Sequence, residues 1–307
     1  MKPIVFILTS VIFIATACKT DEPLRGPIET EICQLSDDRG LSYMEYGPED
    51  GFPVFYFHGF PGSHEDIHLF NGPELAEKLR IRIIAVNRPG YSDSDPRSGR
   101  SLTDWSADVT ELADHLGIGK FSILGYSGGA PFALSCAFAI PERIEKVVIV
   151  SGMGPADAPE AKKGKAMLIP KAPKLILKGM SKMIVKKPEK IEANMIKGFP
   201  EVDQAILENS EAKAALMDAI REAFRSGYEG ALEDAKIYKA PWDFDLSEIN
   251  QAVIWWHGGL DENVKIETAE FVIQNIPNCS PVIKPEEGHL SLLVHSAEEI
   301  LTTFLEP

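Results

Sequence analysis

Ser127 is the residue whose surroundings most clearly suggest chemistry. It lies in Gly125-Tyr126-Ser127-Gly128-Gly129, a G-x-S-x-G pattern between an apolar run, Phe121–Leu124, and a helical stretch, Ala130–Ile140. A tight turn between a strand and a helix pushes such a serine hydroxyl out above a sheet. The helix N-terminus beneath it favours negative charge. The pattern in this context predicts a nucleophile at Ser127, and the alternative is a glycine-rich strand-to-helix turn with a chance serine.

A serine hydroxyl is a weak nucleophile unless a base takes its proton and an acid orients that base. Among the seven histidines, His289 is the best placed to be the base. It follows the expected strand Pro281–Lys284 and stands at the start of a helix, so it would lie over the carboxyl edge of a sheet. Asp261 follows a strand and a Gly-Gly turn and is the expected acid. Glu262 is the fallback for this role, and a plain helix cap is the alternative role for Asp261. His257 and His295 are expected to be structural.

The loop His58-Gly59-Phe60-Pro61-Gly62 follows the apolar run Val54–Phe57. One of the two backbone donors of an oxyanion hole is expected there, and the residue after the nucleophile supplies the other. The expected pair is therefore the N–H groups of Phe60 and Gly128. Two preorganised donors of this kind can lower a barrier by several kcal/mol.

These residues need a scaffold, and the chain supplies short β-rich runs that alternate with helical stretches from the fourth run onward. Several runs, such as Val147–Val150, are apolar throughout, which is typical of strands buried on both faces of a parallel sheet. The pattern predicts a three-layer α/β/α sandwich. The first three runs lie close together and predict an antiparallel meander. The expected strands are Ile32–Leu35, Leu41–Tyr46, Val54–Phe57, Ile81–Val86, Phe121–Leu124, Val147–Val150, Ala252–Trp256 and Pro281–Lys284.

Helical patterning without strands occupies residues 154–245, between the sixth and seventh runs. We expect a helical cap there, inserted into a core formed by residues 31–153 and 246–307. Within the cap, residues 161–190 carry ten lysines against one acid, Glu189. A solvated lysine face on a packed helix explains this charge. The alternative is a basic, Met-rich lid that touches an anionic membrane or steers an anionic substrate.

The N-terminus has the pattern of an export signal. Lys2 precedes a short apolar run, and residues 1–17 end in Ala15-Thr16-Ala17, directly before Cys18. This order predicts a signal peptide, and Cys18 resembles the acylated cysteine of bacterial lipoproteins, although Ala15 stands where that motif usually has Leu. Residues 18–30 would form a tether. The expected location is the bacterial cell envelope, with a lipid anchor in the membrane. Periplasmic or secreted protein is the alternative, and a retained membrane anchor is a weaker one.

The chain resembles the capped α/β-hydrolases in four features. They are the loop at His58–Gly62, the segment Asn87-Arg88-Pro89-Gly90-Tyr91-Ser92, the motif around Ser127, and the pair Asp261 and His289 late in the chain. The resemblance extends over nearly all of residues 31–307. It implies an eight-stranded, mostly parallel sheet, a helical lid, and no metal or organic cofactor. It also implies that Cys33 and Cys279 lie on opposite sheet edges, too far apart for a disulfide.

The chemistry expected of such a site is serine-based acyl transfer on a small-molecule substrate, with carboxylic ester hydrolysis as the default. A serine in place of a carboxylate disfavours epoxide opening and dehalogenation, because the resulting alkyl ether could not be hydrolysed. Aminopeptidase, C–C hydrolase, thioesterase and perhydrolase activities stay open, as does a non-catalytic surface lipoprotein that binds ligands. The formal net charge of −15 argues against a nucleic-acid partner.

Overall fold

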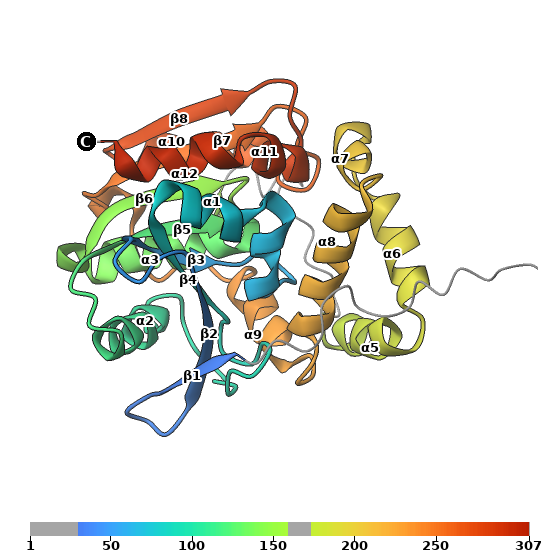
Figure 1. Ribbon diagram of the computed structural model, residues 1–307, viewed down its shortest axis with the longest axis horizontal. Helices are drawn as coiled ribbons and strands as arrows, with labels where there is room; N and C mark the ends of the chain where they lie inside the picture. Colours follow the sequence, from blue (N-terminus) through green and yellow to red (C-terminus); the bar gives the residue numbers. More distant parts are fainter. Residues whose placement is uncertain (1–29, 159–172, 307) are drawn as a thin grey trace, which may run out of the picture.

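The computed structural model describes residues 30–158 and 173–306, and a central sheet of eight strands runs through the molecule (Figure 1). The spatial order of the strands is β1-β2-β4-β3-β5-β6-β7-β8. Residues 1–29, which include Cys18, the signal peptide and most of the tether, lie outside the described residues. The strands are β1 Glu31–Gln34, β2 Gly40–Tyr46, β3 Phe52–Phe57, β4 Ile81–Val86, β5 Phe121–Tyr126, β6 Ile144–Val150, β7 Ala252–Gly258 and β8 Cys279–Lys284.

The sheet is mostly parallel, as predicted. β1 pairs antiparallel with β2 and β2 antiparallel with β4, whereas every neighbouring pair from β4 to β8 is parallel. Because parallel strands end at the same edge, the loops that follow β3, β5, β7 and β8 gather at one place. β1 with Cys33 and β8 with Cys279 form the two opposite edges.

The predicted meander of the first three strands is wrong for β3. Val54 of β3 pairs in parallel with Ile83 of β4 on one side and with Ser122 of β5 on the other. β3 is therefore separated from β2 by β4. The reason is burial: Val54–Phe57 is buried throughout and suits a central strand covered on both faces. The helical connection from β3 to β4 also permits the parallel pairing that a short turn cannot.

Helices cover both faces of the sheet, which completes the three layers (Figure 1). Side chains alternate along β3: Phe55 and Phe57 belong to a buried cluster that includes residues of α2, α3 and α10, whereas Val54 and Tyr56 belong to a second cluster that includes residues of α1, α11 and α12. These helices are α1 Gly72–Leu79, α2 Asp104–His115, α3 Ala130–Ala139, α10 Ile266–Asn275, α11 His289–His295 and α12 Ala297–Thr302.

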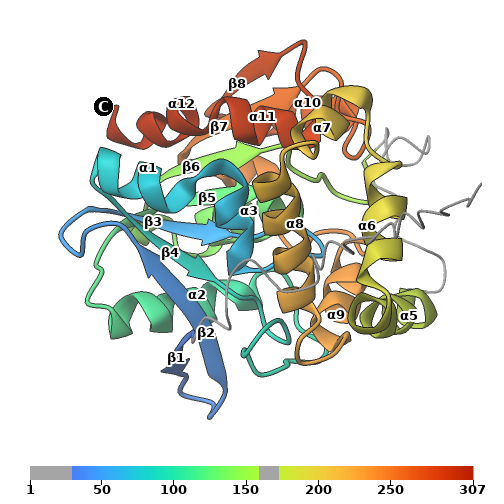
Figure 2. The ribbon, with the colours of Figure 1, turned by 45° about the vertical axis from the view of Figure 1, so that its right-hand side comes forward.

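Between β6 and β7 the described residues form helices and contain no strand. Figures 1 and 2 both place α5, α6, α7 and α8 beside one end of the sheet. α8 packs on the 3-10 helix η1, His64–Phe70, which follows β3. In the part of the chain that the structure describes, no helix is long and apolar enough to cross a bilayer. The helices are α5 Pro173–Lys186, α6 Pro188–Ile196, α7 Glu201–Ile206, α8 Ser210–Ala223 and α9 Glu229–Ile237.

A buried ion network joins α9 to the loop after β4. Arg88 Nε donates to Asp234 Oδ2 at 2.9 Å, and both side chains are fully buried. Arg100 binds the other carboxylate oxygen of Asp234, and the Tyr91 hydroxyl donates to Asp234 Oδ2 at 2.8 Å. One carboxylate therefore compensates two buried guanidinium groups and holds α9 against the core.

Replacing Asp234 by Asn should lower the free energy of unfolding by about 3–5 kcal/mol, because two buried guanidinium groups lose their counter-charge. Urea denaturation followed by circular dichroism would measure this. Glu298→Gln is the control, since it breaks the exposed Lys78–Glu298 pair and should cost less than about 1 kcal/mol. Similar small losses in both variants would contradict the role given to Asp234.

Candidate active site

Ser127 sits at the sharp turn between β5 and α3, in a conformation that side chains rarely adopt. Its φ is 50°, in the left-handed region, which costs about 1–3 kcal/mol for a non-glycine residue. Two glycines permit the turn: a Cβ on Gly129 would lie 2.1 Å from the Phe57 carbonyl oxygen, and one on Gly125 2.9 Å from the Ala133 Cβ. The predicted elbow is therefore present, and its close packing excludes side chains at both glycines.

Three of the predicted residues meet above this turn. His289 Nε2 lies 2.9 Å from Ser127 Oγ, and His289 Nδ1 lies 2.7 Å from Asp261 Oδ2. Their relative exposures are 4% for Ser127 and 5% for each of the other two, so bulk water is largely excluded. The arrangement provides an unbroken hydrogen-bonded path from a carboxylate to a serine hydroxyl.

Asp261 bonds both to His289 and to the turn that follows it. Its Oδ1 accepts from the N–H groups of Asn263 and Val264, both at 2.8 Å, while Oδ2 faces His289. The alternative role of a helix cap is wrong, because the N-cap position of α10 is Lys265. Glu262 is exposed and pairs with Lys265, so it is not placed to substitute. His257 is buried and bonds to the Val264 carbonyl at 2.8 Å, which holds the same loop.

The surroundings of His289 raise the pKa of its imidazole. Burial alone lowers this pKa, but the charge of Asp261, its hydrogen bond and the charge of Asp203 outweigh burial. A protonated imidazole is thereby stabilised, as a group that accepts the serine proton requires. Asp203 lies on α7, and the sequence carried no signal for it beyond an acid in the first turn of a helix.

Phe60 and Gly128 lie in contact next to Ser127. A Cβ on Gly128 would be 2.7 Å from the Phe60 Cβ and 3.2 Å from the Phe60 nitrogen. Tyr238 supports both residues: its hydroxyl donates to the Gly128 carbonyl at 2.8 Å, and its ring meets that of Phe60 edge-on at 5.1 Å. The two residues predicted to supply an oxyanion hole therefore lie close together, and both contact a tyrosine that sequence reasoning did not single out.

Two buried side chains, Arg88 and Asp66, hold the loop that carries Phe60. Arg88 donates to the carbonyl oxygens of His58 and Gly59 at 2.6 and 2.9 Å. Asp66 accepts from the Gly59 N–H at 2.8 Å. Burial raises the pKa of Asp66 to about 7, although the hydrogen bond from Gly59 and the charge of Arg88 lower it. Burial and Arg88 together hold the pKa of His58 well below its ordinary value, which fits a supporting residue rather than a base.

The remaining histidines stay apart from the triad residues. His64 is buried and bonds to Asn87, and His295 is half-exposed at the end of α11 beside Glu287. Among the described residues, no three His, Cys, Asp or Glu side chains are grouped so that they could hold a metal ion.

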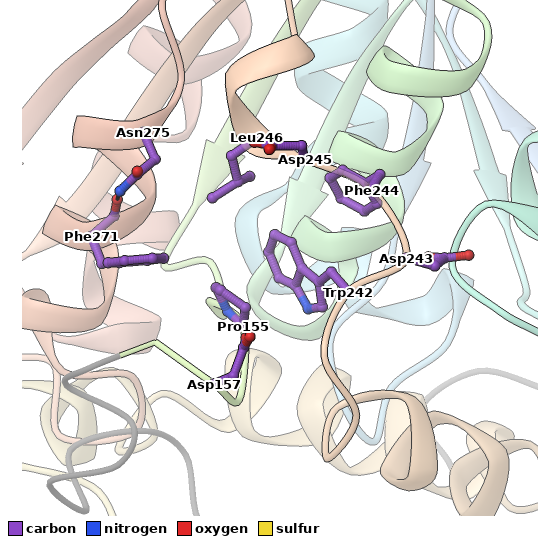
Figure 3. A pocket seen from close by; sticks show the side chains of 9 residues that line it. All are labelled: Pro155, Asp157, Trp242, Asp243, Phe244, Asp245, Leu246, Phe271 and Asn275. Carbon is purple, nitrogen blue, oxygen red and sulfur yellow. Dashed lines mark hydrogen bonds between the residues drawn. The ribbon is translucent and has the colours of Figure 1, made fainter.

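An open hollow of about 460 Å³ lies where the segment after β6 meets the segment after α9 (Figure 3). The rings of Trp242, Phe244 and Phe271 border it, and three aspartates, Asp157, Asp243 and Asp245, are also among its lining residues. Asp243 accepts from Thr103 and is already engaged. Ser127, Asp261 and His289 do not line this hollow, so it is separate from the triad residues.

The chain belongs to the family described as the alpha/beta hydrolase fold, whose pattern matches residues 53–296. The chain is 35% identical over 122 residues to the non-heme chloroperoxidase of Streptomyces lividans, which is 39% of this chain and 44% of the relative.

It is 29% identical over 131 residues to the proline iminopeptidase of Neisseria gonorrhoeae, 41% of each chain. The chain thus matches less than half the length of either relative. Among solved structures, an esterase from Exiguobacterium antarcticum superposes with a TM-score of 0.67 at 18% identity, covering 89% of this chain and 97% of that one. At this identity the likeness concerns the fold.

Replacing Asp66 by Asn should make stability less sensitive to pH. Folding raises the pKa of Asp66 from 3.8 to about 7, so its stabilising contribution is complete below pH 3.8 and is lost as pH rises through 7. The Tm of Asp66→Asn relative to wild type should therefore become more positive between pH 5 and 8, by about 4 °C or more. Scanning calorimetry would measure this, with Glu298→Gln as the exposed control. A difference that stays constant with pH would contradict the assignment.

Proposed function

We propose that this protein is a serine hydrolase that cleaves a carboxylic ester of a small molecule through an acyl-enzyme. Ser127 is the nucleophile, His289 the base and Asp261 the acid, and the amides of Phe60 and Gly128 form the oxyanion hole. The observation that carries the proposal is the hydrogen-bonded path from Asp261 through His289 to Ser127, at 2.7 and 2.9 Å. It ends beside two residues able to present backbone donors.

The reaction would proceed in two halves. His289 Nε2 takes the proton of Ser127 as Oγ attacks the ester carbonyl, and the oxyanion rests on the two amides. The imidazolium gives this proton to the departing alkoxide, which leaves as an alcohol. Water then enters, and His289 takes one of its protons as the water oxygen attacks the acyl carbon. The bond from the acyl carbon to Ser127 Oγ breaks, the imidazolium returns the proton to Oγ, and a carboxylic acid leaves. Asp261 holds the Nδ1–H tautomer throughout and stabilises the imidazolium.

The match to a chloroperoxidase favours perhydrolysis as a second candidate for the same acyl-enzyme. In perhydrolysis, hydrogen peroxide replaces water in the second half of the reaction, and the product is a peracid. The iminopeptidase relative is a weaker guide to activity, because the loop here reads His-Gly-Phe-Pro-Gly rather than the His-Gly-Gly-Pro-Gly typical of iminopeptidases. Assaying esters with and without peroxide separates the two candidates by the product formed.

Replacing Ser127 by Ala should abolish both labelling by a fluorophosphonate probe and hydrolysis of p-nitrophenyl esters, because within residues 30–158 and 173–306 no other hydroxyl is hydrogen-bonded to the His289 imidazole. A fall in kcat of about 10⁴-fold or more is expected. Ser122→Ala is the matched control. This buried serine lies on β5, the strand before Ser127, and its hydroxyl has no hydrogen-bond partner among the residues that the structure describes, so the variant should keep full activity. A folded wild type that neither labels nor hydrolyses any ester would favour the ligand-binding alternative.

We also propose that the protein is exported, acylated at Cys18 and held at a membrane by this lipid anchor. The sequence around Cys18 supports it. Helix α5 supports contact with an anionic lipid surface, because it carries a row of lysines spaced four residues apart and two strongly exposed apolar side chains. Leu175 and Val185 are 75% and 78% exposed. The lysines of that row are Lys174, Lys178, Lys182 and Lys186, all exposed.

Lipidation can be tested by expressing the full chain in bacteria supplied with a radiolabelled fatty acid. Label should appear on wild type and on the Cys279→Ala control and should be absent from Cys18→Ala, because only the thiol at position 18 would be acylated. An exported wild-type chain without label would contradict the lipid anchor and leave the periplasmic or secreted alternative.

A further inference from the structure

A carboxylate from the cap reaches the backbone of the proposed catalytic histidine. Asp203 lies on α7 and is fully buried. Its Oδ2 accepts from the His289 N–H at 2.8 Å, and its Oδ1 accepts from the N–H groups of Leu290 and Ser291 at 3.0 and 2.9 Å. These three donors belong to the first turn of α11, where a helix has no internal acceptors for its N–H groups.

In most helices such donors are satisfied by a residue immediately before the helix. Here that residue is Gly288, which has no side chain, and its own N–H donates to Ser291 Oγ at 2.7 Å. A Cβ at Gly288 would lie 2.5 Å from Asp203 Oδ1. The missing side chain thus leaves the space that the carboxylate of α7 occupies, and the helix is capped from 86 residues away in the chain.

We propose that Asp203 is a positioning residue through which the helical cap orients His289, so that the base is fully set only when α7 is docked on α11. The inference rests on the proposed function, because it concerns the same imidazole. The ring is held at Nδ1 by Asp261 from the core, and its backbone is held by Asp203 from the cap. Undocking α7 would leave three N–H donors of a buried turn without an acceptor.

The charge of Asp203 also acts on the imidazole. The groups that face His289 are Asp261 and His257 from β7 and its loop, Asp203 from α7, and Tyr126 and Ser127 from the elbow. Of these, Asp261 and Asp203 raise the pKa of His289. Because His289 must be neutral to accept the serine proton, activity should rise with pH through this pKa, and removing a carboxylate should move the rise to lower pH.

The informative variant is Asp203→Asn, which has nearly the same shape. Its single oxygen cannot serve three donors, its amide group would face at least one N–H, and its charge is gone. We expect kcat to fall about 10- to 100-fold through misorientation of the base. We also expect the acidic limb of kcat/KM to move down by about half a pH unit or more. Asp203→Glu, which retains the charge, should lower kcat and leave the limb close to its wild-type position.

Asn209→Ala is the matched control. Asn209 caps the neighbouring helix α8 by accepting from the N–H groups of Glu211 and Ala212, so its loss loosens the cap without touching α11. It should lower the Tm while leaving the pH profile unchanged. If Asp203→Asn and Asn209→Ala shift the profile equally, or if neither shifts it, Asp203 is merely a structural helix cap and the proposal fails.

A measurement that needs no turnover separates this inference from the proposed function. The ¹⁵N resonances of the His289 imidazole, assigned with a His289→Gln variant, can be titrated in wild type and in Asp203→Asn. A lower pKa in Asp203→Asn supports the inference even if no ester is hydrolysed, and an unchanged pKa overturns it. Failure of the fluorophosphonate probe to label wild type would instead count against the proposed function.

Discussion

The hydrogen bond between Ser127 and His289 joins residues that are 162 positions apart in the chain, and much of the structure serves to keep it at 2.9 Å. Each partner stands at the start of a helix that follows a parallel strand, Ser127 after β5 and His289 after β8. Parallel pairing brings these strand ends to one edge. The fold therefore brings Ser127 and His289 together, and local turns orient their side chains.

The orientation of these turns depends largely on buried carboxylates that accept hydrogen bonds from backbone N–H groups. Asp261 holds the turn before α10, Asp66 holds Gly59 and Asp203 holds the first turn of α11. A carboxylate buried for this purpose must find donors or counter-charges, since desolvation otherwise neutralises it. Asp66 shows the cost in its pKa of about 7. The same rule explains Asp234, which balances two buried guanidinium groups.

The region between β6 and β7 contributes more than a cover. Tyr238 reaches the Gly128 carbonyl, Asp234 holds Arg88 against the loop of Phe60, and Asp203 contacts the backbone of His289. Residues from this region therefore contact the turn at Ser127, the loop of Phe60 and the first turn of α11. In the proposed mechanism, movement of this region would change the reaction rate, because it would disturb groups that must stay aligned.

Local patterns in the sequence determined the strands, the elbow and the identity of the three triad candidates, because apolar runs, glycine turns and a serine between strand and helix are features of neighbouring residues. They did not determine the place of β3, which follows from burial on both faces and a helical crossover, or the supporting roles of Asp66, Asp203, Asp234 and Tyr238. An acid in a helical stretch looks the same in sequence whether it faces water or caps a distant helix. Only tertiary packing decides which carboxylate is buried and which amides it meets, since those partners come from segments far apart in the chain.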